Sequence, residues 1–143
     1  MIVIPFKAHH IHEMTTYGGQ SWVAEYIGKT GLDATDYEKA GPAFSGAVDG
    51  EIIGCAGLIV CHENRALTWA VFSDRAPRHF VSIHKVALAF LNTQAIRRIE
   101  AYVDTEFPAA RRWVERLGFT CECEHMRDFF PGGRAGALWT RLK

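Results

Sequence analysis

Three basic side chains, Arg75, Arg78 and His79, lie close together in one short loop of the sequence. The loop separates a predicted strand, Leu67–Ser73, from a predicted long helix, Phe80–Thr93. The first N–H groups and the dipole of a helix favour an anion, and arginine forms paired hydrogen bonds with phosphate oxygens. The loop is therefore a candidate phosphate site. The alternative is a solvated loop whose arginines bind nothing specific.

Histidines and cysteines suggest a second kind of chemistry, metal binding. His9, His10 and His12 carry imidazoles, the commonest metal ligands, but they do not share one helix face and no two of them are four residues apart. Cys121 and Cys123 are predicted to point to one face of a strand, where core packing is the simpler interpretation. A metal-dependent hydrolase would need these two groups to meet. We expect surface histidines, core cysteines and no metal site.

Other catalytic patterns are few. His84 and Lys85 lie in the first turns of the predicted helix 80–93, where a general base is conceivable, but the simpler interpretation is a histidine at the edge of an apolar face. The sequence contains no G-x-S-x-G, H-E-x-x-H or glycine-rich phosphate motif. Its aromatic residues do not alternate with basic ones as a nucleic-acid platform requires. The basic loop is therefore the main candidate site.

The elements around this loop predict a parallel βαβ crossover followed by a further helix. After the strand and helix named above come a strand, Arg98–Asp104, and a helix, Pro108–Leu117, whose proline suits a first helical turn. The helix 80–93 has one broad apolar face, widened by Val81, which predicts a mostly buried helix. The strand 98–104 alternates apolar and polar residues, so we expect it to have one core face.

The rest of the chain supplies further strands and short helices. Asp49-Gly50 lies between two β-rich runs and is a strong hairpin signal, and the second run is so apolar that both its faces should be covered. The other predicted elements are a strand at Ile2–Phe6, helices at Ala8–Tyr17, Trp22–Ile27 and Asp36–Lys39, strands at Ala43–Val48, Ile52–Val60 and Phe119–His125, a turn at Pro131–Gly136 and a last strand at Ala137–Leu142. This order predicts an α/β fold, a mixed central sheet with helices on both faces.

Length and composition predict one domain over residues 1–143, with 48% hydrophobic and 22% charged residues. The 16 basic and 16 acidic residues balance, so no net field attracts nucleic acid or an anionic membrane. The apolar runs are shorter than a membrane span, and the N-terminus lacks the features of a secretion signal. The four cysteines show no disulfide-scaffold spacing. We expect a cytoplasmic protein with free thiols that binds neither nucleic acid nor a membrane.

The run Arg111–Phe119, with the sequence RRWVERLGF, and the order of elements resemble the acyl-CoA N-acyltransferases of the GNAT superfamily. There a helix ending in Leu-Gly-Phe leads into the strand that completes the acceptor side. The resemblance covers nearly the whole chain. Within the superfamily the chain looks most like small phage-encoded GNAT-like proteins, including the internal virion protein of short-tailed coliphages. Those share a Trp-containing strand, a short basic loop without glycines, and a helix closing on a Gly-aromatic or Gly-aliphatic step.

The resemblance implies a site for acetyl-CoA as co-substrate and requires no metal. In active GNAT enzymes two central strands splay apart and the pantetheine arm lies between them, while the following loop holds the pyrophosphate. The cofactor-binding residues that this implies are the end of the first strand and the basic side chains after it, Ala70, Val71, Phe72, Ser73, Arg75, Arg78 and His79. The residues implied to line the substrate cleft are Tyr102 and Trp113.

Four positions depart from the superfamily pattern. Its loop has the form Gln/Arg-x-x-Gly-x-Gly/Ala, and with Arg75 in the first place the small residues become Arg78 and Phe80, whose side chains crowd the close backbone approach that glycine permits. The asparagine of the superfamily corresponds to Phe107. Its tyrosine, the acid for the leaving thiolate, corresponds to Val114. Valine transfers no proton, so the catalytic residues are unknown.

The leading functional interpretation is a phage-type N-acetyltransferase that transfers an acetyl group from acetyl-CoA to an unidentified amine. No carboxylate lies on the strand 67–73 to serve as base, which leaves Glu51, His84 or a water chain. Direct attack by a neutral amine would still gain from proximity. The alternative is a catalytically inactive GNAT-fold protein of the phage particle, or a protein-binding protein, with other virion proteins as partners and the virion as its location.

Overall fold

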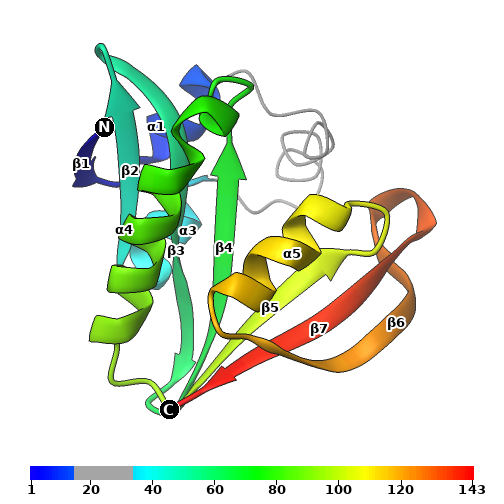
Figure 1. Cartoon of the computed structure of the whole chain (residues 1–143). Coiled ribbons are helices and arrows are strands. Elements are labelled where there is room, and N and C mark those ends of the chain that lie inside the picture. Colours follow the sequence, from blue (N-terminus) through cyan, green and yellow to red (C-terminus); the bar gives the residue numbers. More distant parts are fainter. Residues whose placement is uncertain (15–33) are drawn as a thin grey trace. The chain divides into compact units, whose positions relative to one another are not determined.

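A computed structural model describes residues 1–14 and 34–143 of the chain (Figure 1). In chain order the strands are β1 (Ile2–Pro5), β2 (Ala43–Val48), β3 (Glu51–His62), β4 (Arg65–Phe72), β5 (Arg98–Asp104), β6 (Thr120–Phe130) and β7 (Arg134–Leu142). The helices are α1 (Ala8–Glu13), α3 (Ala34–Ala40), α4 (Phe80–Thr93) and α5 (Pro108–Arg116), with short 3-10 helices η2 (Ala76–His79) and η3 (Pro131–Gly133). The helix predicted at Trp22–Ile27 and the end of the first helix near Tyr17 lie outside the described residues.

Hydrogen bonds link the strands in the order β1-β2-β3-β4-β5-β7-β6. β4 and β5 are parallel, with Arg65 opposite Arg98 and Leu67 opposite Glu100, which confirms the predicted βαβ crossover through α4. The pairs β1–β2, β2–β3, β5–β7 and β6–β7 are antiparallel. The sheet is therefore mixed, as the order of elements predicts.

The hairpin between β2 and β3 turns at Asp49 and Gly50, whose φ angles are 51° and 80°. Positive φ at both central residues of a two-residue loop is the type I′ geometry that matches the twist of antiparallel strands, and Gly50 adopts it without steric cost. The predicted hairpin is confirmed. Both faces of β3 are covered, since three successive residues, Ile53, Gly54 and Cys55, are all buried.

The described residues form two compact units. Unit 1 comprises the described part of Met1–Ile59 together with Trp69–Asn92, and unit 2 comprises Val60–Thr68 and Thr93–Lys143. β3 and β4 each contribute residues to both units. The single domain expected over residues 1–143 stays a prediction.

In unit 1, helices cover both faces of the strands. Phe44 and Ser45 are neighbours in β2 and therefore face opposite ways. The Phe44 ring packs against Phe90 of α4 with centroids 5.0 Å apart, whereas Ser45 Oγ lies 2.8 Å from Nδ1 of His10 in α1. α4 thus lies on one face and α1 on the other, which confirms the predicted layers within unit 1 (Figure 1).

The core of unit 1 gathers side chains from α1, α3, β3 and β4. Trp69 in β4 packs edge-on against Phe6 and against Tyr37 of α3, each with centroids 5.1 Å apart. The helix α3 contains the helical turn predicted at Asp36–Lys39 and brings Tyr37 to this cluster. The buried members of the cluster are Phe6, Ile11, Met14, Ala34, Cys55 and Val71.

α4 has the predicted bounds, but the expectation that it is mostly buried is wrong. Ile83, Ala87 and Leu91 form a single buried stripe, whereas Val81 is 73% exposed. Val81 lies about 200° round the helix from Ile83, so it cannot widen the same face. No helix within residues 1–14 and 34–143, α4 included, is long and apolar enough to cross a membrane.

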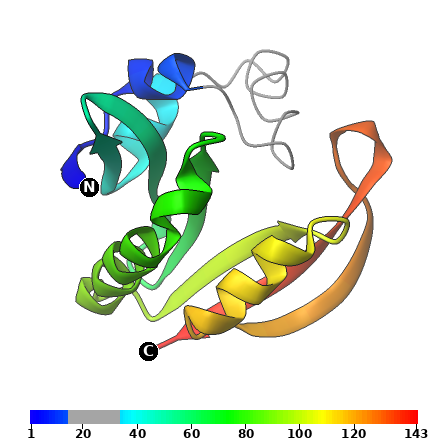
Figure 2. The ribbon, with the colours of Figure 1, turned by 45° about the horizontal axis from the view of Figure 1, so that its top comes forward.

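In unit 2, α5 lies along one face of β5 and β7 in both views (Figures 1 and 2). Its Arg111 guanidinium lies over the Trp139 ring, 5.9 Å from the centroid, and Trp139 is opposite Ala101 in the strand register. The next residues along each strand, Thr140 and Glu100, therefore lie on the face away from α5. Glu100 is only 3% exposed, so the expectation of one core face for β5 is wrong.

The pairing of β6 with β7 contains bulges. Cys121 is opposite Trp139 and Cys123 is opposite Leu138, so two residues of β6 advance where β7 advances by one. Trp139 and Leu138 face opposite sides, and the expectation that the two cysteines share a face is therefore wrong. Both strands are longer than predicted, and β7 begins inside the turn expected at Pro131–Gly136.

Candidate functional site

The basic loop begins where β4 ends and runs through η2 into α4. Ser73 is 4% exposed, and its N–H donates to the Ile53 carbonyl of β3 at 2.9 Å. Its own carbonyl accepts the Ala76 N–H at 3.1 Å, and its Oγ accepts the Arg75 N–H at 3.2 Å. One buried serine thus fastens the loop to β3 and sets its turn.

Several backbone N–H groups of the loop bond within the loop itself. Those of Arg75 and Ala76 donate to Ser73, and that of Phe80 donates to the Pro77 carbonyl. The resemblance implies a loop whose N–H groups cradle a pyrophosphate. Because these three N–H groups already have acceptors, an anion here would be held mainly by side chains.

The three basic side chains of the loop have different surroundings. The Arg75 guanidinium forms an ion pair with the Glu51 carboxylate at the start of β3, so its charge is already balanced. Arg78 is exposed, and no described carboxylate forms an ion pair with it. His79 is half-buried at the end of η2. Arg78 is therefore the loop side chain best placed to meet an incoming phosphate.

The end of β4 carries the residues predicted to face the pantetheine arm. Val71 is 5% exposed and belongs to the core of unit 1. Phe72 is half-buried on the α4 side, and its ring centroid lies 6.0 Å from that of Phe80. Beneath it is Gly54 of β3, where an added Cβ would lie 2.9 Å from Phe72 Cδ1. Phe72 and Phe80 are thus brought together, and Ala70 lies half-buried before them.

The two residues predicted to line the substrate cleft lie on different faces of unit 2. Trp113 is half-buried in α5. Tyr102 follows Ala101 in β5 and so points to the face away from α5. Its ring stacks on Phe129 of β6, with centroids 4.9 Å apart and planes 32° apart. Within unit 2 the structure therefore does not bring Tyr102 and Trp113 together.

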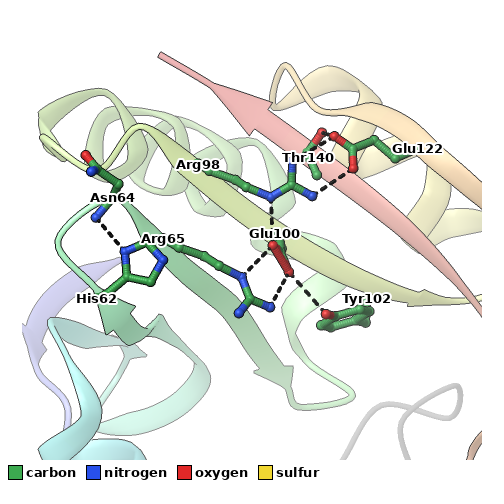
Figure 3. A network of polar contacts seen from close by, with 8 residues as sticks. All are labelled: His62, Asn64, Arg65, Arg98, Glu100, Tyr102, Glu122 and Thr140. Atoms are coloured by element: carbon green, nitrogen blue, oxygen red, sulfur yellow. Dashed lines mark hydrogen bonds and ion pairs between the residues drawn. The ribbon is translucent and has the colours of Figure 1, made fainter.

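On the same face as Tyr102 lies a buried carboxylate, Glu100, with two arginine partners (Figure 3). Its Oε2 accepts a hydrogen bond from Nε of Arg65 and another from Nε of Arg98, each at 2.8 Å. Its Oε1 accepts one from Arg65 Nη2 at 3.0 Å and one from the Tyr102 hydroxyl at 3.1 Å. The carboxylate is fully bonded, as burial of a charge requires.

The contacts continue to the outer strand β6. Arg98 donates two hydrogen bonds to Glu122, at 2.8 and 2.7 Å, and Glu122 Oε1 accepts another from Thr140 at 2.9 Å. We call Arg65, Arg98, Glu100, Tyr102, Glu122 and Thr140 the Glu100 network. It joins strands β4, β5, β6 and β7 within unit 2.

Electrostatics make Glu100 an anchor rather than a general base. Hydrogen bonds from Arg65, and further bonds from Arg98 and Tyr102, outweigh the effect of burial and hold its pKa at about 2. The bonds from Arg98 also lower the pKa of Glu122. Burial and the neighbouring carboxylate raise the pKa of Tyr102, which keeps its hydroxyl protonated. A carboxylate with so low a pKa takes up no proton at neutral pH.

Sequence reasoning missed the Glu100 network because alternation in β5 places Glu100 on a face without saying what covers it. A usable signal was present. Arg98 and Glu100 are two residues apart in one strand and therefore share a face, and Arg65 begins the strand predicted to run parallel beside them.

The histidines divide differently from the expectation. His10 is 6% exposed and bonded to Ser45, so the expectation of surface histidines is wrong for it. His9 is exposed and pairs with Glu13 at 2.6 Å, and His12 is exposed. His84 is half-buried on α4, and its Nδ1 is buried without a hydrogen-bond partner among the described atoms. In the parts of the chain described, no three His, Cys, Asp or Glu side chains come together as metal ligands do.

At the position that the resemblance assigns to a catalytic tyrosine, α5 presents a buried aliphatic side chain. Val114 is 7% exposed, and its carbonyl accepts the Phe119 N–H at 3.0 Å. Phe107, at the position of the asparagine, precedes α5 and accepts the Ala110 N–H at 3.1 Å through its carbonyl. Neither side chain can donate or accept a proton.

No family model and no curated protein match the sequence. Solved structures do match. A GNAT-family acetyltransferase from Bacillus anthracis is 18% identical, with a TM-score of 0.66 over 98% of this chain and 93% of that chain. A spermidine N-acetyltransferase SpeG chimera from Vibrio cholerae and hSSAT is 17% identical, with a TM-score of 0.67 over 99% and 94%. A GNAT-superfamily phosphinothricin acetyltransferase from Sinorhizobium meliloti, solved with AcCoA, is 14% identical, with a TM-score of 0.65 over 99% and 87%.

These likenesses extend over almost all of the chain at low sequence identity. Shared folds host different functions, so a likeness of this kind concerns architecture and leaves the chemistry to the residues. The strand order, the parallel crossover through α4 and the helix α5 before the last hairpin agree with it. The chain has the GNAT acyl-CoA N-acyltransferase fold.

Proposed function

We propose that this protein binds acetyl-CoA through its basic loop and transfers the acetyl group to an amine. The observation that supports the proposal best is the placement of Arg78, exposed and unpaired by any described carboxylate, between the end of β4 and the start of α4. In a GNAT fold this is where the loop that meets the pyrophosphate lies. Acetyl-CoA is a cytoplasmic metabolite, so this role assigns the protein to the cytoplasm, that of the host for a phage protein.

In this proposal the loop binds by charge more than by a backbone nest. The usual small residues are replaced by Arg78 and Phe80, and several loop N–H groups are already bonded. Arg78 and His79 would contact the phosphates. Arg75 would contribute less, because its guanidinium is already paired with Glu51. The backbone of residues 70–73 would pair with the pantetheine arm.

The transfer would proceed by direct attack. The neutral amine nitrogen attacks the thioester carbonyl carbon, the carbon–sulfur bond breaks, and the proton lost by the amine reaches the departing thiolate through water. Val114 supplies no acid for that thiolate, so positioning of the two reactants must provide most of the acceleration. We therefore expect a slow enzyme whose rate rises with pH as more of the amine is neutral.

Calorimetric titration with acetyl-CoA tests the binding step. We expect Arg78→Ala to weaken binding about tenfold, because one charge-assisted contact with a phosphate is lost. Glu51→Gln should tighten binding, since it frees the Arg75 guanidinium from its ion pair. Arg97→Ala is the matched control, because it removes an equal exposed charge beyond the far end of α4. No binding at millimolar acetyl-CoA, or equal losses for Arg78→Ala and Arg97→Ala, would contradict the proposal.

The transfer step needs its own assay, release of the CoA thiol in the presence of amines. Spermidine is the first acceptor to test, because one of the similar structures is a spermidine N-acetyltransferase. A mass increase of one acetyl group on an amine identifies the acceptor. Binding of acetyl-CoA without thiol release from any amine would leave the binding proposal standing and overturn the transfer.

A second candidate is a non-catalytic GNAT-fold protein that binds a protein partner in a phage particle. The observation that favours it is the burial of Val114, at 7% exposure, where the resemblance places the proton-donating tyrosine. This candidate predicts that the protein neither binds acetyl-CoA nor releases its thiol. It also predicts that the intact chain co-purifies with virion proteins. The calorimetric titration therefore separates the two candidates.

A further inference from the structure

Unit 1 contains a buried row of three polar side chains that the proposed function does not use. His10 of α1, Ser45 of β2 and Cys55 of β3 are 6%, 0% and 1% exposed. Ser45 Oγ lies 2.8 Å from His10 Nδ1 and 3.3 Å from Cys55 Sγ. The row therefore connects α1 to two strands by hydrogen bonds through an otherwise apolar interior.

The bonding pattern fixes which nitrogen of His10 carries the proton. The backbone N–H of Lys7 donates to Nδ1 at 3.1 Å, so Nδ1 must be an unprotonated acceptor. Ser45 Oγ has one proton, which it donates either to Nδ1 or to Cys55 Sγ, 3.3 Å away. Burial raises the pKa of Cys55 to about 11, so its thiol keeps its proton. The Lys7 bond requires a neutral His10 whose Nδ1 carries no proton.

Protonation of His10 would break this arrangement at one defined place. An imidazolium carries N–H groups on both nitrogens and accepts no hydrogen bond. Ser45 could rotate to accept the new N–H, but the Lys7 N–H would face another donor and lose its partner. Lys7 is the N-cap residue of α1, so the lost bond is one that closes the first turn of the helix. A charge would also enter an interior formed by apolar side chains, including Phe6, whose ring centroid lies 6.2 Å from that of His10.

Among the described residues, the charged groups around His10 come from α1, its preceding residue and α3. His9 lies beside it, with ring centroids 4.6 Å apart, and pairs with Glu13. Lys7 Nζ pairs with Glu38 of α3 at 3.3 Å. Burial, then His9 and Lys7, lower the pKa of His10, while the carboxylates of Glu13 and Glu38 act in the opposite direction. Burial is the largest of these effects, so the neutral form is favoured at neutral pH.

The release of α1 would extend to α3. Glu38 accepts the Ala8 N–H at 3.0 Å as well as the Lys7 bond, so two hydrogen bonds join α3 to the start of α1, where His10 accepts the Lys7 N–H. Ile11 and Met14 of the same segment lie in the core of unit 1. We propose that His10 is a proton-controlled latch, which holds α1 and α3 on unit 1 when neutral and releases them when protonated.

The direction of the pH dependence follows from linkage. The ordinary pKa of a histidine is 6.5, and that of folded His10 lies below it. As the pH falls below 6.5, a released His10 binds a proton that the folded one does not, so the latched state loses stability. The loss continues until the pH reaches the pKa of folded His10. Above pH 6.5 the latch contributes its full stability.

Hydrogen exchange read by mass spectrometry tests this latch. After correction for intrinsic rates, we expect opening of α1 and α3 to increase about tenfold from about pH 7.5 to about pH 5, relative to β5 and β7 of unit 2. His10→Asn should abolish this response, because the asparagine oxygen can replace Nδ1 as acceptor and does not titrate. His12→Asn, at an exposed position of the same helix, should keep it.

Three outcomes would contradict the latch proposal: no pH-dependent opening of α1 and α3 in the wild type, equal pH-dependent opening in His10→Asn, or equal opening of both units. If His10→Asn does not fold, NMR titration of the wild type decides. The midpoint of the His10 imidazole shift and the midpoint of α1 amide loss must coincide below the ordinary histidine pKa of 6.5. Separate midpoints would exclude His10 as the group responsible.

Discussion

Glu100→Ala is expected to lower the free energy of unfolding by about 3 kcal/mol, near the lower end for loss of one partner of a buried ion pair. The carboxylate is 3% exposed and holds Arg65, Arg98 and Tyr102. Its removal leaves the Arg65 guanidinium without its carboxylate, whereas Arg98 keeps its bonds to Glu122. The two arginine side chains are 40% and 31% exposed, so water can partly replace the lost bonds and the loss stays near that lower end.

Urea unfolding followed by tryptophan fluorescence measures this loss. Glu124→Ala, at an exposed position of β6, is the matched control and should change stability by less than about 0.5 kcal/mol. Acid should mimic the substitution: the Glu100 contribution is complete above its ordinary pKa of 4.5 and disappears as the pH falls toward about 2. A Glu100→Ala protein as stable as Glu124→Ala would show that the network contributes no stability.

Gly57→Ala should destabilise unit 1 by about 2–3 kcal/mol, the range for forcing atoms into a packed interior. A Cβ at this position of β3 would lie 2.5 Å from the Ala43 Cβ, 2.9 Å from its Cα and 2.8 Å from the Pro42 carbonyl oxygen. Two of these atoms are backbone, so no side-chain rotation relieves the contact. The adjacent Leu58 N–H donates to the same Pro42 carbonyl at 3.0 Å, which keeps the strands from separating.

Gly46→Ala provides the control for this effect. A Cβ there would meet the Met1 side chain, with Sδ at 2.8 Å, and a flexible methionine end can move away. The substitution also restricts the unfolded chain, so its net effect should lie within about 1 kcal/mol of zero. Thermal unfolding of the two variants makes the comparison. Equal melting temperatures would mean that β2 can shift away from β3, contrary to the packing described.

Local signals were sufficient where one segment determines its own structure. The bounds of α4 and β5 agree with the prediction. A helical apolar stripe and a strand alternation are each visible in a short stretch of sequence. The turn at Asp49 and Gly50 is fixed by the tolerance of these two residues for positive φ. Such features need no knowledge of distant segments.

Features that depend on distant partners were not predictable in the same way. Glu100 is buried because Arg65, 35 residues earlier, neutralises it. The bulges of β6 separate Cys121 from Cys123 through a register that only β7 defines. His10 is buried because Ser45, also 35 residues away, accepts or donates a bond inside the core. A periodicity shows the direction of a side chain but not the group that it meets.

The candidate site shows the same division. Its position, between a strand end and a helix start, was predictable from element order, and the basic loop lies there. The pairing of Arg75 with Glu51 was not, since it joins residues 24 positions apart. Nor was the use of loop N–H groups by Ser73 and Pro77, which follows from the detailed turn geometry. These details make Arg78 the first choice for substitution.

The interleaving of the two units affects how the chain can be made and divided. Val60–Thr68 of unit 2 is synthesised before Trp69–Asn92 of unit 1. It therefore leaves the ribosome before the rest of unit 2, Thr93–Lys143. During that interval Arg65 has no Glu100 to bind. Unit 2 can therefore be completed only after Trp69–Asn92 of unit 1 has been synthesised. No single cut in the polypeptide separates the units, so neither can be expressed as one continuous fragment.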